Sequence, residues 1–260
     1  MVNKDLGLIF FIPSLSCPPL KYIIFTTILL TSLAFAQEEK GYPWLESLDP
    51  GEGYKESGHR LSALAFGLNP LEKFNGEEEV LLVSVHGSRS EGYEWIYPLQ
   101  TLDTENSATF FYKWDDSKCY INSAKKLRFN LSKEIKKLPS LKRLVIIGHS
   151  YGGVLVTSLV ENWKNNLPTE IHSIAGPIGS AFSRNACTFN PPERIPNKLT
   201  FYQWKTQHHL DVAFKRLKND PQDLNLLGSK TTRLPESYRG RRLGHNWSIS
   251  WVADKLGPLN

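Results

Sequence analysis

The chain has 260 residues, a formal net charge of +5, and hydrophobic and charged fractions of 40% and 22%, which are ordinary for a globular protein. This composition excludes a disordered, collagen-like or polytopic membrane chain, and the length suffices for one domain with a well-formed core. Many basic residues lie between Lys198 and Arg242, but without a nucleic-acid-binding pattern. We therefore expect no nucleic-acid partner and a solvated basic face, with transient contact to an anionic membrane surface as the alternative.

The N-terminus has the pattern of an export signal. Basic residues precede a short apolar run, Tyr22–Leu33, which leads to Ala34-Phe35-Ala36. Because the run is shorter than the roughly 20 residues needed to span a bilayer, a cleaved signal peptide is favoured over an uncleaved anchor. The sequence predicts a signal peptide at residues 1–36, a mature domain at residues 37–260, and a periplasmic or secreted protein.

The mature chain begins with an irregular region and continues with strands and helices in alternation. Proline and glycine punctuate residues 37–78, which predicts loops and short pieces. Continuous apolar runs predict buried strands, and apolar residues spaced along one face predict helices. The predicted strands are residues 80–85, 107–112, 144–147, 170–175 and 199–204, and the predicted helices are residues 124–138, 151–165 and 246–256. This alternation predicts a mainly parallel sheet with its ligand site at the carboxyl ends of the strands.

A glycine-flanked serine lies between a predicted strand and a predicted helix. Gly148-His149-Ser150-Tyr151-Gly152 matches the pattern G-x-S-x-G, and this strand–turn–helix context is the one a nucleophile elbow requires. Gly148 and Gly152 leave room for a sharp turn in which strand and helix approach closely. The motif predicts Ser150 as a nucleophile facing the N-terminus of the following helix. The alternative is a glycine-rich turn with an incidental serine.

A serine hydroxyl needs a base to accept its proton and an acid to orient that base. In hydrolases with such an elbow, the chain order is serine, then aspartate or glutamate, then histidine. His245, just before the last predicted helix, is the candidate base. Asp211 is the candidate acid because it follows the strand at residues 199–204, and Asp220 and Asp223 are the alternatives.

With these residues the chain resembles the compact lipase- and esterase-like members of the α/β-hydrolase superfamily. The resemblance rests on His86-Gly87, Gly148–Gly153, Ser173–Pro177 and Gly244-His245-Asn246. It implies an α/β fold with a mainly parallel central sheet and helices on both faces. It also implies hydrolysis of carboxylic esters through an acyl-serine, without a metal or a cofactor. Because the segment Gly176–Asn197 is short, we expect no large cap domain.

The resemblance further implies an oxyanion hole made of two backbone N–H groups. One belongs to Tyr151, and the other lies in the loop after His86-Gly87, where Ser88 is the best candidate. The expected substrate is a small-molecule or lipid ester. The alternatives are a thioesterase, acyltransferase or peptidase with the same triad, or a non-catalytic binding protein with the same fold. His208 and His209 lack the partners and spacing of a zinc site.

Cys119 and Cys187 are the two cysteines of the predicted mature chain. In an oxidising compartment such a pair often forms a disulfide, and two buried thiols are the alternative. Both cysteines belong to loops beyond the predicted sheet. We hypothesise a disulfide that joins two loops at the rim of the site.

Overall fold

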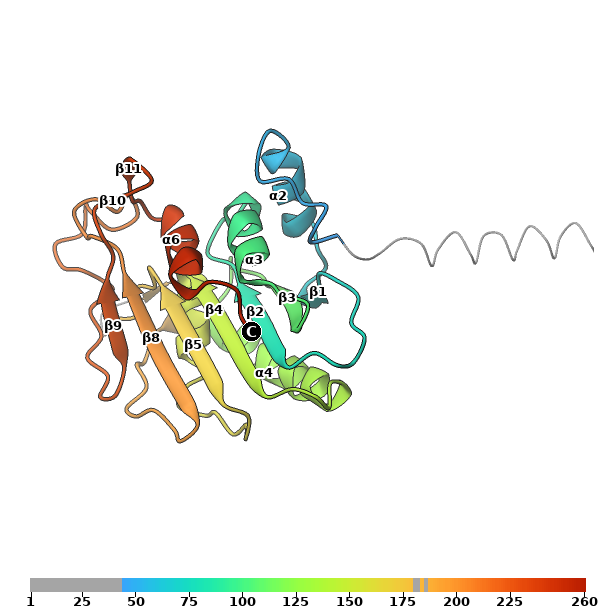
Figure 1. Cartoon of the computed structure of the whole chain (residues 1–260). Helices are drawn as coiled ribbons and strands as arrows, with labels where there is room; N and C mark the ends of the chain where they lie inside the picture. The colour runs from blue at the N-terminus through green and yellow to red at the C-terminus, as the bar shows by residue number, and fades with distance from the viewer. Residues whose placement is uncertain (1–43, 180–182, 185–186) are drawn as a thin grey trace, which may run out of the picture. The chain divides into compact units, whose positions relative to one another are not determined.

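A mainly parallel sheet of seven strands forms the centre of the molecule (Figure 1). Its strands are β1 (Gly67–Pro70), β2 (Val80–Val85), β3 (Ser107–Lys113), β4 (Arg143–His149), β5 (Thr169–Ile174), β8 (Leu199–Lys205) and β9 (Lys230–Arg233). They lie in the order β1-β3-β2-β4-β5-β8-β9. Strand β1 is antiparallel to β3, and the other neighbouring pairs are parallel. The carboxyl ends of the parallel strands therefore share one edge.

This description comes from a computed structural model, which describes residues 44–179, 183–184 and 187–260. The predicted signal peptide, its cleavage site after Ala36 and the predicted start of the mature domain lie outside the described residues. Within the described part of the chain, no helix is long and apolar enough to cross a membrane.

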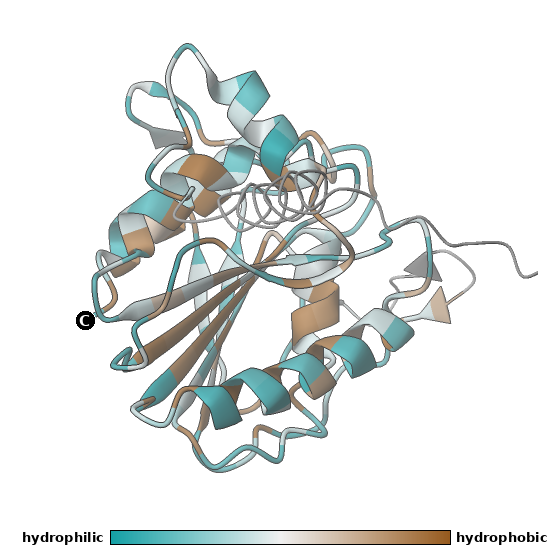
Figure 2. Cartoon of the chain, turned by 90° about the vertical axis from the view of Figure 1, so that its right-hand side faces the viewer, coloured by the Kyte–Doolittle hydropathy of each residue, from teal (hydrophilic) through white to brown (hydrophobic). Residues whose placement is uncertain are grey.

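Helices cover both faces of the sheet, and the apolar runs of the strands explain why. The helices are α2 (Tyr54–Ser62), the 3-10 helix η1 (Tyr93–Trp95), α3 (Ile96–Leu102), α4 (Tyr120–Lys137), α5 (Tyr151–Thr157) and α6 (Trp247–Leu256). Alternate residues of β2 point to opposite faces. Leu81 and Val83 pack in the core with α4 and α5, whereas Val80 and Leu82 pack in the core with α3 and α6. Figure 2 shows hydrophobic strands between the helices, whose outer faces are largely hydrophilic.

The structure confirms the predicted fold class and most of the predicted elements. The five predicted strands coincide with β2, β3, β4, β5 and β8, and the first and last predicted helices coincide with α4 and α6. Two predictions are wrong. Residues 37–78 were expected to form loops and short pieces, but they include the nine-residue helix α2 and the edge strand β1. The helix predicted at residues 151–165 ends at Thr157.

Helix α5 ends early because its backbone hydrogen bonds tighten after Thr157. The N–H groups of Leu159 and Val160 donate to carbonyls three residues back rather than four. The hydroxyl of Thr157 donates to the Gly153 carbonyl, and the hydroxyl of Ser158 donates to the Leu155 carbonyl, both at 2.6 Å. Such side-chain bonds compete with the regular helical pattern. The apolar residues of this segment remain buried although they form turns.

Two small hairpins complete the fold. Strands β6 (Ser183–Arg184) and β7 (Cys187–Thr188) form one, and β10 (Ser237–Tyr238) and β11 (Arg241–Arg242) form the other. The described residues between β5 and β8 comprise only the first hairpin and loops. In this described part, the chain has no large cap domain over the carboxyl edge of the sheet.

Candidate active site

Ser150 occupies a strained turn between β4 and α5. Its backbone has φ 54° and ψ −120°, in the positive-φ region that non-glycine residues rarely adopt. Neighbouring glycines permit the turn. A Cβ on Gly148 would lie 2.4 Å from the Gly152 carbonyl oxygen, and a Cβ on Gly152 would lie 2.3 Å from the Val85 carbonyl oxygen. The pattern G-x-S-x-G is therefore required by close packing between β4, α5 and the end of β2.

The loop after β2 lies directly against Ser150. A Cβ on Gly87 would be 2.9 Å from the Cβ of Ser150. Buried His86 holds this loop, because its Nδ1–H donates to the Gly87 carbonyl at 2.8 Å and its Nε2 accepts from the Trp114 backbone N–H at 3.2 Å. Burial lowers the pKa of His86 to about 4, so the ring is neutral and can be donor and acceptor at once. The hydroxyl of the next residue, Ser88, donates to Asp116 at 2.9 Å.

Asp211 and His245 form a hydrogen-bonded pair. The Nδ1 of His245 lies 2.8 Å from Oδ2 of Asp211. The Asp211 side chain is fully buried, and that of His245 is 11% exposed. Two further donors fix the carboxylate: the Thr206 hydroxyl bonds to Oδ2 at 2.5 Å, and the Ala213 N–H bonds to Oδ1 at 2.8 Å. A carboxylate held in this way keeps the proton of the imidazole on Nδ1 and leaves Nε2 as a proton acceptor.

The two alternative acids have other partners. Asp220 accepts from the Arg233 guanidinium at 2.7 Å, and Asp223 accepts from the Lys205 ammonium at 2.8 Å. The sequence alone left this choice open. Of the three carboxylates, Asp211 is the one that the structure brings to His245.

His149 links the Ser150 turn to the segment that carries His245. Its ring lies 4.7 Å from the ring of His245, and its Nε2 is 3.1 Å from the backbone oxygen of His245. Because that oxygen can only accept, the proton of His149 is on Nε2. Among the described residues, no hydrogen bond joins the Ser150 hydroxyl directly to the His245 ring. The sequence placed His149 in the elbow but did not predict its contact with His245.

Several residues around the pair were missed by sequence reasoning. Thr206 is fully buried and reaches Asp211, as described above. Phe214 packs edge-on against the His245 ring at 5.1 Å. Arg241 and Arg242 line the same surface cavity as His245. Of these residues, only Thr206 could have been found from the sequence, because it lies between the predicted strand at residues 199–204 and the candidate acid Asp211.

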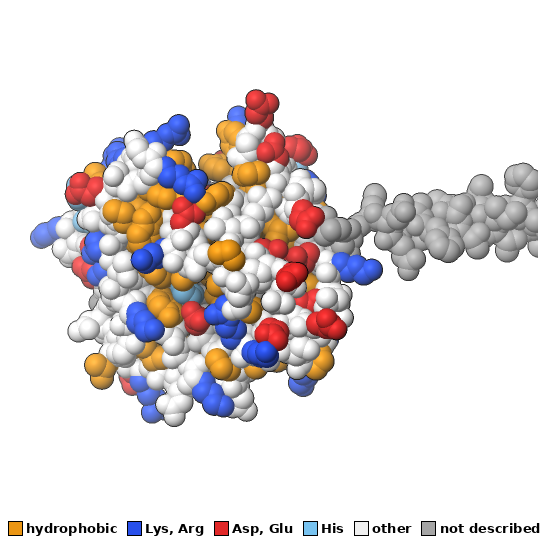
Figure 3. Space-filling view, viewed as in Figure 1, with side chains coloured by type: hydrophobic (Ala, Val, Ile, Leu, Met, Phe, Trp, Pro, Cys, Tyr) orange, Lys and Arg blue, Asp and Glu red, His pale blue; other side chains and the backbone are white. Residues whose placement is uncertain are grey.

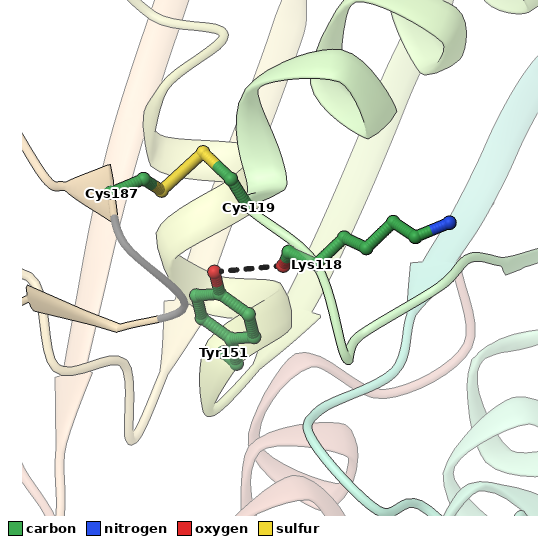
Figure 4. The surroundings of a disulfide bond; sticks show 4 residues. All are labelled: Lys118, Cys119, Tyr151 and Cys187. Carbon is green, nitrogen blue, oxygen red and sulfur yellow. Dashed lines mark hydrogen bonds between the residues drawn. A yellow bond between two sulfur atoms is a disulfide. The ribbon is translucent and has the colours of Figure 1, made fainter.

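The two cysteines form the disulfide that we hypothesised from the sequence. Cys119 is the N-cap of α4 and Cys187 begins β7, with their Cα atoms 5.6 Å apart. Figure 4 shows the neighbouring Lys118, whose backbone carbonyl accepts the hydroxyl of Tyr151 at 3.2 Å. Because Tyr151 directly follows Ser150, the disulfide lies close to the elbow.

Three of the four remaining histidines of the described chain, His172, His208 and His209, make other side-chain contacts. His208 bonds to the Phe214 backbone oxygen at 3.0 Å, and His209 lies 3.8 Å from the carboxylate of Glu236. His172 is buried and stacks on Tyr202. Among the residues that the structure describes, no three His, Cys, Asp or Glu side chains gather in a group that could hold a metal ion.

Comparison with known proteins supports the fold. No family model and no curated protein sequence matches the chain. Its structure is similar to that of Est1E from Butyrivibrio proteoclasticus, with a TM-score of 0.50 and 15% identity over 73% of this chain and 89% of that one. It is also similar to a lipase-esterase related protein from Clostridium acetobutylicum, with a TM-score of 0.49 and 12% identity over 73% and 98% of the two chains. At 15% identity the likeness to Est1E concerns architecture alone, and the architecture is the α/β-hydrolase fold.

Proposed function

We propose that this protein is a serine hydrolase that cleaves carboxylic esters. The observation that carries the proposal is the Asp211–His245 pair, held next to a strained Ser150 turn at the carboxyl edge of the sheet. This is the chemistry of a serine nucleophile with its base and orienting acid, in the chain order of α/β hydrolases. The expected substrate is a small-molecule or lipid ester, and no metal or cofactor takes part.

In this mechanism, Ser150 Oγ attacks the carbonyl carbon of the ester while His245 Nε2 takes the hydroxyl proton. The new C–O bond forms, and the carbonyl oxygen becomes an oxyanion. When the carbonyl re-forms, the bond to the alcohol breaks and His245 gives its proton to the departing oxygen. Water then repeats the sequence on the acyl-serine and releases the acid. The serine–histidine hydrogen bond that this requires is often completed only when substrate binds.

The proposed oxyanion hole consists of the backbone N–H groups of Ser88 and Tyr151. Tyr151 is the first residue of α5, so its N–H points from the positive end of the helix dipole. Ser88 follows Gly87, where an added Cβ would lie 2.9 Å from the Cβ of Ser150, so this loop passes close to the serine. Loss of one such donor typically costs about 3–4 kcal/mol of transition-state stabilisation.

The direct test is labelling with a fluorophosphonate, followed by peptide mapping, together with hydrolysis of 4-nitrophenyl esters. We expect the label on Ser150, and we expect Ser150→Ala to lose labelling and turnover while circular dichroism and melting temperature stay those of the wild type. Ser158→Ala, in the turn after α5, is the matched control and should be labelled normally. Labelling or turnover that persists in Ser150→Ala would refute the assignment. Product analysis on ester, thioester and amide substrates separates the esterase from the related activities.

We also propose that the protein is exported to the periplasm or secreted, with cleavage after Ala36. The export pattern of residues 1–36 supports this, and so does the Cys119–Cys187 disulfide, because disulfides persist in oxidising compartments. The N-terminal sequence of the protein recovered from cell fractions tests it. A cytosolic protein that retains its first 36 residues would refute it.

A further inference from the structure

Two arginines share a surface cavity with the proposed base. The cavity is open, has a volume of about 420 Å³, and is lined by Val212, Arg241, Arg242, Gly244, His245, Asn246 and Trp247. Arg241 and Arg242 are exposed residues of β11. No carboxylate side chain is among these lining residues. The lining of the cavity therefore includes both arginines and the residue of the proposed base.

The charges of these two arginines are not paired with a carboxylate in the described part of the chain. Arg239, in the same hairpin, is paired with Asp254 at 3.0 Å. By contrast, across the ranges that the structure describes, no ion pair involves Arg241 or Arg242. Guanidinium groups present several N–H donors in a planar fork that matches a carboxylate or a phosphate. An anion bound in this cavity would not have to displace a carboxylate from either arginine.

The hairpin holds the arginines in place. Arg239 and Gly240 both have positive φ, at 49° and 72°, as in the two-residue turns that connect twisted strands tightly. The guanidinium of Arg241 lies over the Trp247 ring, 5.7 Å from its centre. Such pre-ordering lowers the entropy lost on binding. In Figure 3, Lys and Arg side chains gather with hydrophobic ones around the region where Figure 1 places β10 and β11.

We propose that Arg241 and Arg242 bind an anionic group, a carboxylate or a phosphate, on the alcohol part of the ester substrate. This inference rests on the proposed function. Because Asp211 occupies Nδ1 of His245, the proton must pass from Nε2 to the departing alcohol oxygen. The alcohol therefore has to lie beside His245, and the cavity that His245 lines offers space at that residue. The enzyme thus selects esters whose alcohol carries a negative charge.

The test compares acetate esters whose alcohols carry either an anionic group or an uncharged group at the same ring position. These are 4-acetoxybenzoate and 4-acetoxyphenyl phosphate, which are anionic, and 4-acetoxybenzamide, which is neutral. We expect the ratio of kcat/KM for each anion to that for the amide to fall about tenfold in Arg241→Gln/Arg242→Gln, as for two charge-assisted contacts in a partly exposed site. The lysine pair, Arg241→Lys/Arg242→Lys, should keep part of the preference because it keeps the charge. The two anions distinguish a carboxylate site from a phosphate site.

Two controls accompany this comparison. Arg194→Gln removes an exposed arginine from the loop before β8, outside this cavity, and should leave the ratio unchanged. Raising the ionic strength from 0.01 M to 0.1 M shortens the screening length from about 30 Å to about 10 Å, so the preference of the wild type should weaken. A ratio that is equal in the wild type and the glutamine pair would overturn the proposal. A membrane result would also overturn it: the wild type binds phosphatidylglycerol vesicles, Arg241→Gln/Arg242→Gln does not, and the wild type shows no preference for the soluble anionic esters.

A binding measurement separates failure of the anion site from failure of the proposed function. If the wild type hydrolyses none of these esters, the esterase proposal fails. The site is then decided by titrating Ser150→Ala with 4-hydroxybenzoate, the expected alcohol product, and following it by NMR. Binding that weakens about tenfold when the two arginines are replaced by glutamine supports the site. Absent or unchanged binding overturns it.

Discussion

The substitution Asp211→Asn tests the proposed acid most sharply, because no orientation of the new amide both satisfies the buried partners of Asp211 and keeps the proton of His245 on Nδ1. In one orientation the amide oxygen accepts from His245 and Thr206, as Oδ2 does now, and the amide NH₂ then faces the Ala213 N–H. Two donors meet at a fully buried site, which costs about 1–3 kcal/mol for the unpaired N–H. In the other orientation the NH₂ donates to His245 Nδ1. That ring then carries its proton on Nε2 and cannot accept the proton of Ser150.

Both outcomes lower activity, and the second removes the base. We expect Asp211→Asn to reduce kcat by about 10³- to 10⁴-fold. Asp220 pairs with Arg233 and Asp223 pairs with Lys205, and neither carboxylate contacts His245, so Asp220→Asn and Asp223→Asn should keep kcat within about threefold of the wild type. The assay is kcat for a 4-nitrophenyl ester, with the melting temperature as the folding control. ¹⁵N NMR of the His245 ring reports which nitrogen carries the proton. A loss below tenfold in Asp211→Asn, or equal losses in the three variants, would refute the assignment of the acid.

Two further predictions concern stability. Burial and the neighbouring Asp103 carboxyl raise the pKa of Glu72 to about 8, so the folded protein holds a proton there that the unfolded chain has already lost above about pH 4.5. The free energy of unfolding should therefore decrease as the pH rises from about 5 to about 9. In Glu72→Gln the melting temperature should decrease less over the same pH range than in the wild type. The disulfide closes a loop across a sequence separation of 68, which corresponds to about 4 kcal/mol of loop-closure entropy. Replacing Cys119 and Cys187 together by serine should lower the urea midpoint accordingly.

Each stability prediction has its own control. The exposed Glu77→Gln should leave the pH dependence of melting unchanged, and parallel curves for the wild type and Glu72→Gln would contradict the account of Glu72. For the disulfide, urea unfolding of the wild type with and without a reductant should reproduce the difference between the wild type and the double serine variant. An unchanged midpoint in both comparisons would show that the bridge contributes little to stability.

The parts of the fold that could be predicted from sequence are those in which one strand or helix meets the core along its whole length. Strand β2 is apolar on both faces, and the buried face of α4 recurs at helical spacing, so local pattern sufficed for both. The edge strands β1 and β9 have the sequences Gly-Leu-Asn-Pro and Lys-Thr-Thr-Arg and are only partly buried or exposed. An edge strand is held by backbone hydrogen bonds to one neighbouring strand. Its side chains therefore need not follow an apolar pattern that could be recognised in the sequence.

The candidate site divides in the same way. Ser150 was predictable because its turn imposes glycine at fixed neighbouring positions, and His245 was predictable from chain order. The choice among three aspartates was not, because it depends on which loop folds back toward a histidine 34 residues further along the chain. The contact between His149 and His245 spans 96 residues and has no local pattern. Sequence therefore indicates the chemistry and the histidine, and tertiary structure decides which carboxylate pairs with that histidine.

The pairing of two imidazoles raises the question of how the proposed base keeps its affinity for a proton. A protonated His149, with its ring 4.7 Å from that of His245, would oppose the transfer of a proton from Ser150 by like-charge repulsion. Burial holds the pKa of His149 well below its ordinary range, so its ring stays neutral at neutral pH. Its Nε2–H can then donate to the backbone oxygen of His245 and orient the segment that carries the base. His149 thus holds the backbone that carries His245, and its neutral ring does not repel the proton that His245 has to accept.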